Sequence, residues 1–119
     1  MIFNPKKHKI FFYNNFIDMR KGHSSLTMLI TEKTNFEVMD GSLFLFVSKN
    51  KKTIKGVFFD GSGLVLLHKK IEAGKFMSFN VATAMFEVNR DEFKIIFHGG
   101  QIPLSRTGKR IKFKKNKIF

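Results

Sequence analysis

The chain has 119 residues, the length of one domain, and 43% of them are hydrophobic, which is enough to bury a core. It holds no cysteine, so a disulfide framework, a Cys-ligated zinc site and a thiol nucleophile are excluded. Lys and Arg number 22 against 9 Asp and Glu, and the net charge of +13 favours a polyanion, above all nucleic acid, as the partner.

The first part of the chain predicts one strand and one helix. The apolar run from Lys9 to Tyr13 is typical of a strand. Asp18 is a residue type that caps helix N-termini, and the apolar residues after it recur at the spacing of one helical face. We therefore expect a helix over residues 19–32.

Three strands follow in quick succession, over residues 43–48, 53–59 and 64–70. Residues 49–52 and 60–63 join them and have the length and composition of hairpin loops. Because such short loops can only connect neighbouring antiparallel strands, this part of the chain predicts a meander.

The last elements are a further strand or two between Lys75 and Val88 and a second helix. Asn89 and Glu92 have the spacing of a capping box, apolar residues after them share one helical face, and Gly99 supplies a C-terminal stop. The predicted fold class is therefore α+β: a small single domain with an antiparallel β-meander of about five strands and two helices.

The charge is unevenly distributed along the chain. No acid follows Glu92, whereas residues 93–119 carry 8 bases. Blocks of like charge repel themselves until a counter-charge arrives. We expect a domain over residues 1–104 and a basic tail over residues 105–119.

Symmetric closure of the two hairpins sets the register and divides the side chains between two sheet faces. In this register Phe46 lies opposite Lys55, and Lys55 lies opposite His68. One face is nearly all aliphatic and is predicted to be core: Leu43, Leu45, Val47, Ile54, Phe58, Val65 and Leu67. The other face places aromatic residues beside bases: Phe44, Phe46, Lys55, Val57, Phe59, His68 and Lys70.

Two interpretations of this second face stay open. Aromatic residues beside bases are suited to stacking nucleobases and holding phosphates. Alternatively, a helix covers Phe44, Phe59 and Leu66, and only the basic end of the face meets water.

Several motifs occur in an order and at separations that resemble those of a known family. They are Asp18–Gly22, Leu43–Phe46, Ile54–Leu64 and Lys69–Phe76. The chain resembles TnpB, the second open-reading-frame product of the insertion sequence family numbered sixty-six, over about residues 8 to 100. The resemblance implies a small accessory factor that is required alongside a separate transposase, with DNA as a suspected ligand and no catalysis of its own. Lys70 stands where relatives usually have Arg, which replaces a planar bidentate donor with a point charge.

The start of the first predicted helix is a candidate phosphate site. Arg20 and Lys21 would place two cations in its first turn, where the helix dipole disfavours positive charge and a bound anion would reverse that cost. The alternative is that Asp18 caps the helix and offsets both cations. The full set of candidate nucleic-acid-binding residues is Arg20, Lys21, Lys55, His68, Lys69, Lys70, Lys75, Arg106, Lys109, Arg110, Lys112, Lys114 and Lys115.

Signs of catalysis are weak. The glycine-rich loop Asp60–Gly63 lies between hairpin strands, where it is typical of a turn, and no Walker lysine follows it. Most of the acids lie beside predicted turns or caps, where they have ordinary local roles. The four histidines show no paired ligand spacing. We expect no catalytic residue, no metal and no cofactor.

The sequence thus predicts a non-catalytic, DNA-binding accessory protein of transposition, whose partners are duplex DNA at the element ends and the transposase. The alternatives are a protein adaptor that docks on the transposase through the aromatic sheet face, and a small RNA-binding protein that stacks single strands. The longest apolar run, Leu43–Val47, is too short to cross a bilayer, and the N-terminus lacks a signal-peptide pattern. We expect no membrane contact and a cytoplasmic, nucleoid-associated location.

Overall fold

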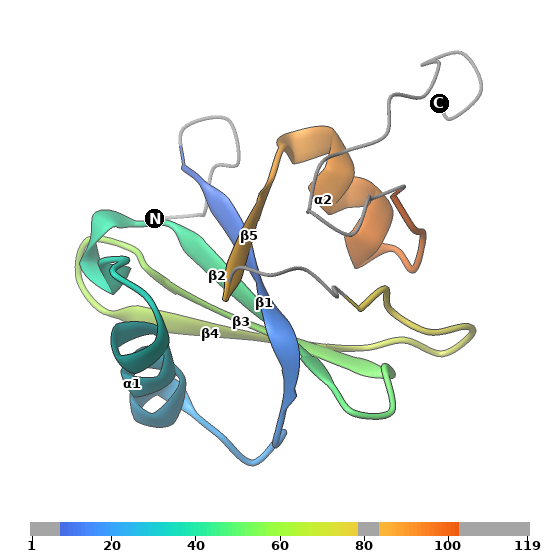
Figure 1. Cartoon of the computed structure of the whole chain (residues 1–119), viewed down its shortest axis with the longest axis horizontal. Coiled ribbons are helices and arrows are strands. Elements are labelled where there is room, and N and C mark those ends of the chain that lie inside the picture. The colour runs from blue at the N-terminus through green and yellow to red at the C-terminus, as the bar shows by residue number, and fades with distance from the viewer. Residues whose placement is uncertain (1–7, 79–83, 103–119) are drawn as a thin grey trace.

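A computed structural model describes residues 8–78 and 84–102. The predicted tail over residues 105–119 lies outside the described residues. The elements run in the order β1 (Ile10–Ile17), α1 (His23–Lys33), η1 (Val38–Asp40), β2 (Leu43–Ser48), β3 (Thr53–Phe59), β4 (Leu64–Lys70), β5 (Met85–Val88) and α2 (Arg90–Phe97). The five strands form one sheet in the order β4-β3-β2-β1-β5, and the predicted α+β class is confirmed (Figure 1).

The predicted antiparallel meander is right for β2, β3 and β4 but wrong for β1. β1 pairs parallel to β2, with Ile10 opposite Leu43, and antiparallel to β5. The connection from 18 to 42 contains α1 and η1, and a parallel pair needs a crossover of this kind, whereas a hairpin does not. The sheet is therefore mixed, with two antiparallel pairs on one side of the parallel pair and one antiparallel pair on the other.

The strands β2, β3 and β4 have the predicted bounds and the predicted register. Phe46 lies opposite Lys55, Lys55 opposite His68, and Thr53 opposite Lys70. The Asp60 carboxylate holds the turn between β3 and β4, because it accepts hydrogen bonds from the backbone N–H groups of Ser62 and Gly63. These bonds lower the pKa of Asp60, and the structural interpretation of the glycine-rich loop is confirmed.

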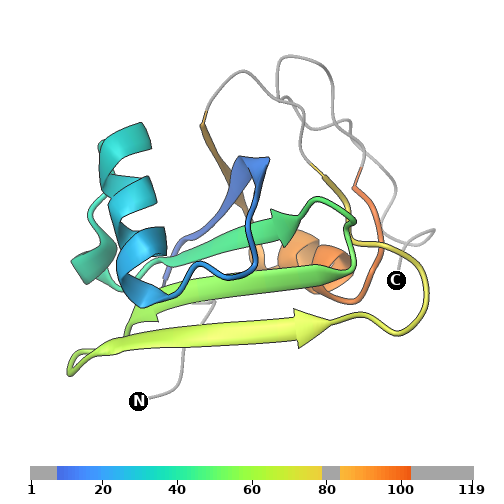
Figure 2. The same cartoon turned by 90° about the horizontal axis from the view of Figure 1, so that it is seen from below.

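Helices cover both faces of the sheet (Figures 1 and 2). The predicted aliphatic face is confirmed as core and packs against α2, with Leu43, Leu45, Ile54 and Ile96 almost fully buried. The opposite face packs against α1 and η1 through a second cluster, whose buried members are Phe11, Ile17, Leu26, Ile30, Val38, Phe44, Phe46, Val57 and Met85. The molecule thus has three layers.

The second helix begins and ends as the sequence predicts. The Asn89 side chain accepts from the Glu92 backbone N–H at 2.8 Å, and the Glu92 carboxylate accepts from the Asn89 backbone N–H at 2.8 Å. Gly99 follows the helix with φ +93°, a conformation that favours glycine. In the region between Lys75 and Val88, the described residues form one strand, β5.

Candidate nucleic-acid interface

The segment between β1 and α1 is held by an ion pair, and the predicted start of the first helix is wrong. The helix begins at His23 with Gly22 as its N-cap, and no side chain caps it. Asp18 accepts instead from the backbone N–H of Arg20 and from its guanidinium, with Nη2 at 2.6 Å from Oδ2. The turn that Asp18 and Arg20 form competes with the helix, so Arg20 and Lys21 precede the first helical turn rather than occupying it.

The Asp18–Arg20 pair lies in water and keeps both groups charged. The Arg20 side chain is 91% exposed and the Asp18 side chain is 45% exposed. Hydrogen bonds from Arg20 hold the pKa of the Asp18 carboxyl well below its usual range, and the same contact raises the pKa of Arg20. Part of the positive charge of this loop is therefore neutralised in the free protein.

Lys55 on β3 anchors the loop between β1 and α1 to the sheet. Its side chain is only 6% exposed, and its ammonium donates to the backbone carbonyl oxygens of Met19 and Lys21, the latter at 2.8 Å. A buried ammonium is costly unless its hydrogen bonds are made, and here two loop carbonyls accept them. In the free protein Lys55 therefore positions the loop, and its ammonium does not face solvent.

The anchor brings together bases from two distant parts of the chain. His68 lies directly opposite Lys55 on β4, so its side chain is on the same sheet face, and Lys70 follows it on that face. Both are exposed, as is Arg20, while Lys21 is half-buried. We name these four residues, Arg20, Lys21, His68 and Lys70, the basic edge.

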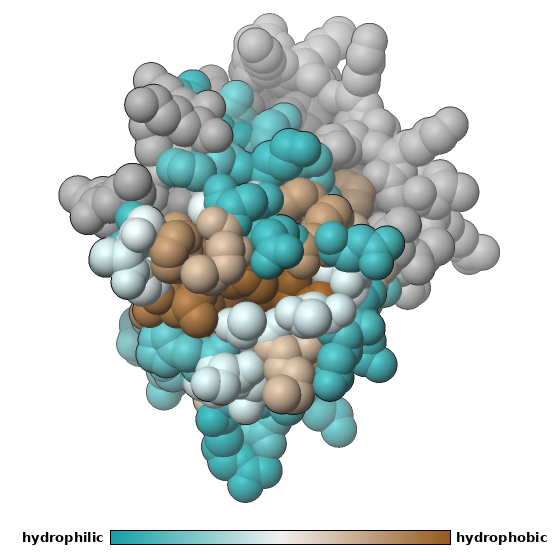
Figure 3. Space-filling view, turned by 90° about the vertical axis from the view of Figure 1, so that its left-hand side faces the viewer, coloured by the Kyte–Doolittle hydropathy of each residue, from teal (hydrophilic) through white to brown (hydrophobic). Residues whose placement is uncertain are grey.

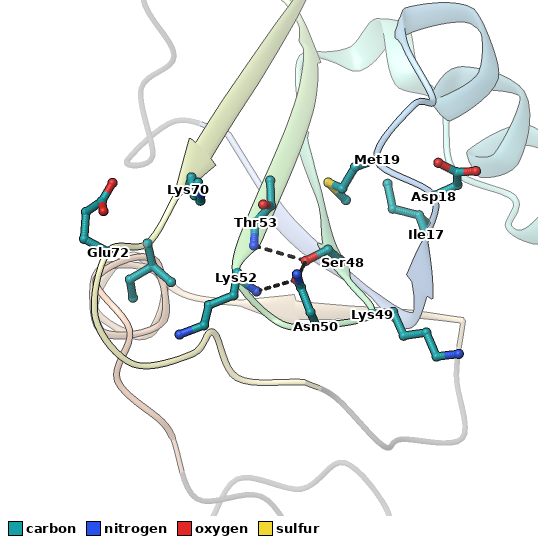
Figure 4. A pocket seen from close by; sticks show the side chains of 11 residues that line it. Ile17, Asp18, Met19, Ser48, Lys49, Asn50, Lys52, Thr53, Lys70 and Glu72 are labelled. Atoms are coloured by element: carbon teal, nitrogen blue, oxygen red, sulfur yellow. Dashed lines mark hydrogen bonds between the residues drawn. The ribbon is translucent and has the colours of Figure 1, made fainter.

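A groove of about 920 Å³ adjoins the basic edge (Figure 4). It runs between the β1–α1 loop, the β2–β3 hairpin and the end of β4, and its charged lining residues are Asp18, Lys49, Lys52, Lys70 and Glu72. Three hydrogen bonds hold the hairpin. The Asn50 amide oxygen accepts from the Ser48 hydroxyl and from the Lys52 backbone N–H, and the Ser48 hydroxyl oxygen accepts from the Thr53 backbone N–H. The groove is therefore bounded on one side by a hydrogen-bonded hairpin and carries the exposed Lys49 and Lys70 along it.

Lys49 and Lys52 line the groove but were not among the predicted binding residues. Lys49 is exposed, whereas the Lys52 ammonium donates to the Gly74 carbonyl oxygen at 2.5 Å. The signal for them is a run of three lysines around one asparagine, but the length and composition of this run are also those of a hairpin loop.

The remaining predicted site residues lie elsewhere. Lys69 points to the α2 face, where its ammonium donates to the Phe97 carbonyl oxygen at 2.7 Å and lies 4.2 Å from the centre of the Phe97 ring. Lys69 thus closes the C-terminal end of α2, where a cation also suits the helix dipole. Lys75 is exposed in the segment after β4. The six tail residues, Arg106, Lys109, Arg110, Lys112, Lys114 and Lys115, lie outside the described residues.

The aromatic residues at the centre of the predicted face do not reach solvent, so the predictions that nucleobases stack on Phe44 and Phe46, or that the transposase docks on them, are wrong. Phe44 and Phe46 have no exposed surface, because α1 and η1 cover them. The alternative, in which a helix covers the face, is confirmed for Phe44 and Leu66; Phe59 is half-buried. That alternative also predicted that the basic end of the face is exposed to water. This is right for His68 and Lys70 but wrong for Lys55, which is buried.

Apolar surface is exposed at other places. Figure 3 shows a strip of apolar side chains that crosses the side of the molecule bearing α1, between polar areas. Among the described residues, the exposed large apolar side chains are Phe16, Met28, Phe36 and Met39. Phe36 stacks on Phe11 with 4.4 Å between ring centres, so even this partly exposed ring is held by the core.

Within residues 8–78 and 84–102, no three His, Cys, Asp or Glu side chains gather as a metal site would require. None of the helices in that part of the chain has the length and apolar character of a membrane span.

Comparison with known proteins places the chain in a family. Two relatives come from Sinorhizobium fredii (strain NBRC 101917 / NGR234). The uncharacterized protein y4jC is 28% identical over 83 residues, which cover 70% of this chain and 71% of the relative. The uncharacterized protein y4hO is 33% identical over 60 residues, which cover 50% of this chain and 52% of the relative. No solved structure matches significantly.

The family described as "IS66 Orf2 like protein" matches residues 8–107. This range contains the whole sheet, both helices and the four residues of the basic edge. The resemblance noted from the motifs is thereby confirmed: the chain belongs to the TnpB family of IS66 Orf2-like proteins, which are accessory proteins of transposition.

Proposed function

We propose that this accessory protein binds duplex DNA at the element ends through the basic edge, without catalysis, and acts there together with the transposase of the same element. The observation that carries the proposal is the convergence of Arg20 and Lys21 with His68 and Lys70 on one end of the sheet, where the buried Lys55 holds the loop in place. A DNA-bound factor of this kind is expected in the cytoplasm with the nucleoid.

The chemistry of the basic edge suits the phosphate backbone better than the base edges. Lys70 and Lys49 present flexible, exposed ammonium groups, which neutralise phosphates as point charges. Contacts of this kind position a protein on the duplex but do not read its sequence. The basic edge therefore supplies affinity, and the selection of element ends is assigned to the complex with the transposase.

Arg20 is a latent phosphate ligand in this proposal. Its guanidinium is paired with Asp18 but is almost fully exposed, so a phosphate can approach its remaining donors without opening the core. An exposed ion pair contributes little to stability, and exchanging the carboxylate for a phosphate costs correspondingly little.

The test compares two double variants with the same loss of charge. Lys21→Gln with Lys70→Gln removes two cations from the basic edge, whereas Lys33→Gln with Lys94→Gln removes two exposed cations from the helices. Binding to a fluorescent element-end duplex and to a random duplex is measured by anisotropy at several salt concentrations.

The basic-edge variant should lose about tenfold in affinity, and its log–log salt slope should become shallower by about 0.9 for each lost phosphate contact. The helix variant should stay close to the parent protein. Equal losses in both variants would show that binding follows total charge, and the basic edge would then be withdrawn as the site.

The tail over residues 105–119 is the second part of the proposed DNA-binding surface. Among its bases are Arg106, Lys109, Arg110, Lys112, Lys114 and Lys115, and it has no acid. Its deletion should weaken duplex binding and flatten the salt slope while the melting temperature stays the same. A large fall in melting temperature would show instead that the tail belongs to the folded domain.

A further inference from the structure

We propose that β4 binds an extended segment of a partner protein as an added antiparallel strand, and that this segment places acidic residues beside the basic end of β4 and apolar residues beside its other end. The proposal concerns a protein ligand and goes beyond DNA binding. It rests on three properties of β4: backbone groups that point away from the sheet, apolar side chains that are incompletely covered, and bases at its C-terminal end.

Among residues 8–78 and 84–102, none pairs with the outer backbone edge of β4. Two hydrogen bonds flank the β3–β4 ladder, from Asp60 N–H to the Gly63 carbonyl oxygen and from Ile71 N–H to the Lys52 carbonyl oxygen. Hydrogen-bonded and non-hydrogen-bonded pairs alternate in an antiparallel ladder. Counting inward from these two flanking bonds, the backbone groups of residues 65, 67 and 69 are the ones that bond to β3. The N–H and C=O groups of residues 64, 66, 68 and 70 therefore point away from the sheet.

β4 is the outermost strand of the sheet (Figure 2). Within residues 8–78 and 84–102, no hydrogen bond uses those outward groups. A long strand with a free edge is a template for pairing with another chain, which is how extended peptides add to sheets.

The side chains at the beginning of β4 are incompletely covered. Every residue of β2 is buried, whereas the four residues Leu64–Leu67 are all only half-buried. They alternate between the two faces, and each lies at the margin of one of the two core clusters. One added strand would cover apolar surface on both faces at once.

The end of β4 has the opposite character. His68, Lys69 and Lys70 follow the apolar half directly, and β4 contains no acid. An added strand with carboxylates at this end gains charge-complementary cross-strand pairs. The edge is therefore divided into an apolar half and a basic half.

A second copy of the chain fits this edge poorly in the register that pairs the whole of β4. Two antiparallel copies related by a two-fold axis through residue 67 would pair Leu64 with Lys70 and Leu66 with His68, so each apolar half would face a basic half. Two chains of net charge +13 would also repel each other. The tail brings bases rather than acids, so charge disfavours it as the occupant too.

The probe is a synthetic peptide as long as β4, with both ends blocked. Its first residues are Asp and Glu and its last residues are Val, Ile and Thr, because an antiparallel partner meets the basic end of β4 first. A peptide of the same composition in reversed order is the matched control. Binding to the full chain is followed by amide hydrogen exchange in NMR.

The peptide should slow exchange at the N–H groups of residues 64, 66, 68 and 70 and leave residues 65, 67 and 69, which β3 already protects, unchanged. The reversed peptide should bind more weakly. Absence of protection, or equal protection by both peptides, would overturn the proposal and indicate that the lysines of β4 only prevent edge-to-edge association.

A pair of variants isolates the backbone contribution. Leu66→Pro removes one outward N–H, and proline is tolerated where a strand N–H faces solvent. Leu66→Ala removes a similar amount of apolar surface and keeps the N–H. The proline variant should bind the peptide about 3- to 10-fold more weakly than the alanine variant. Equal affinities would rule out strand addition.

Charge and self-association are tested separately. Lys70→Glu should weaken binding of the acidic peptide and strengthen binding of a peptide with Lys in place of the acids. An unchanged preference would contradict the placement of the peptide's acids beside the basic end of β4. Sedimentation of the parent protein without peptide should show a monomer. A dimer that Leu66→Pro dissociates would replace the acidic partner with a second copy.

Discussion

Replacing the buried Lys55 with methionine tests whether this lysine holds the β1–α1 loop. Methionine keeps most of the aliphatic stem but removes both hydrogen bonds to the carbonyl oxygens of Met19 and Lys21. We expect the variant to fold, to melt at a lower temperature than the parent and to exchange the Lys21 amide faster, because that amide closes the turn on the Asp18 carbonyl oxygen.

The expected loss of stability is moderate because two effects oppose each other. Hydrogen bonds to a charged group contribute about 1.5–3 kcal/mol each, so two of them amount to about 3–6 kcal/mol. Removing the ammonium also removes the cost of burying it, which is several kcal/mol, and the two half-buried loop residues can turn their carbonyls to water. The free energy of unfolding should therefore fall by about 1–3 kcal/mol, or about 4–12 °C in melting temperature for a domain of this size.

The matched control is Lys70→Met, an exposed lysine on the same sheet face. An exposed substitution of this kind should change the unfolding free energy by less than about 0.5 kcal/mol. Thermal melts and amide exchange are measured for both variants. If Lys55→Met is as stable as the control and its loop amides exchange at the parent rate, the anchoring role of Lys55 is refuted.

Three further predictions concern the loop charge and the packing. In Arg20→Ala, the Asp18 carboxyl should titrate nearer the ordinary value of about 3.9, as an NMR pH titration would show. Because the pKa of Asp18 is depressed in the folded parent, the ionised carboxylate stabilises the fold above that ordinary value, and this stabilisation is lost as the pH falls. The parent should therefore lose more stability than Arg20→Ala on acidification, and equal losses would contradict this. Asp18→Asn should free Arg20 for a phosphate and raise duplex affinity in an anisotropy titration, with a salt slope steeper by about 0.9; weaker binding would show that Asp18 is needed to orient the arginine. Gly56→Ala should lose about 1–3 kcal/mol in a chemical denaturation experiment, because a Cβ there would lie 2.9 Å from Leu45 Cδ2 and 3.1 Å from Leu43 Cδ1. Gly63→Ala, whose Cβ would meet nothing within 4 Å, is the control and should be unchanged.

The two hairpins that join β2, β3 and β4 were predictable because their information is local. The loops at 49–52 and 60–63 leave little freedom in strand pairing, so the bounds of β2, β3 and β4 and the pairing of Phe46 with Lys55 followed from loop length alone. The capping box of α2 was predictable for the same reason, since both of its residues lie within one helical turn.

The position of β1 and the start of α1 depend on contacts that no local pattern contains. The pairing of β1 with β2 spans a helical connection, and its direction is decided by how α1 packs on the sheet. Asp18 is a good helix cap by residue type, but the neighbouring Arg20 offers a bidentate partner that draws the carboxylate away. The true cap, Gly22, carries no side-chain signal at all.

The candidate site shows the same division between local and distant information. Both interpretations of the second sheet face left His68 and Lys70 in water, and both residues are exposed. The burial of Lys55 was not foreseen, because its partners are backbone carbonyls of a loop far away in the sequence. A lysine in a strand between Ile54 and the small Gly56 gives no sign of which groups will receive its ammonium.

The salt dependence of duplex binding by the parent protein tests the central claim most directly. A complex formed through about 5–8 phosphate contacts of the basic edge, the groove lysines and the tail should show a log–log slope between about −4.5 and −7. A flat slope, or the absence of binding at low salt, would contradict phosphate-led recognition and leave this accessory protein with a role through protein contacts alone.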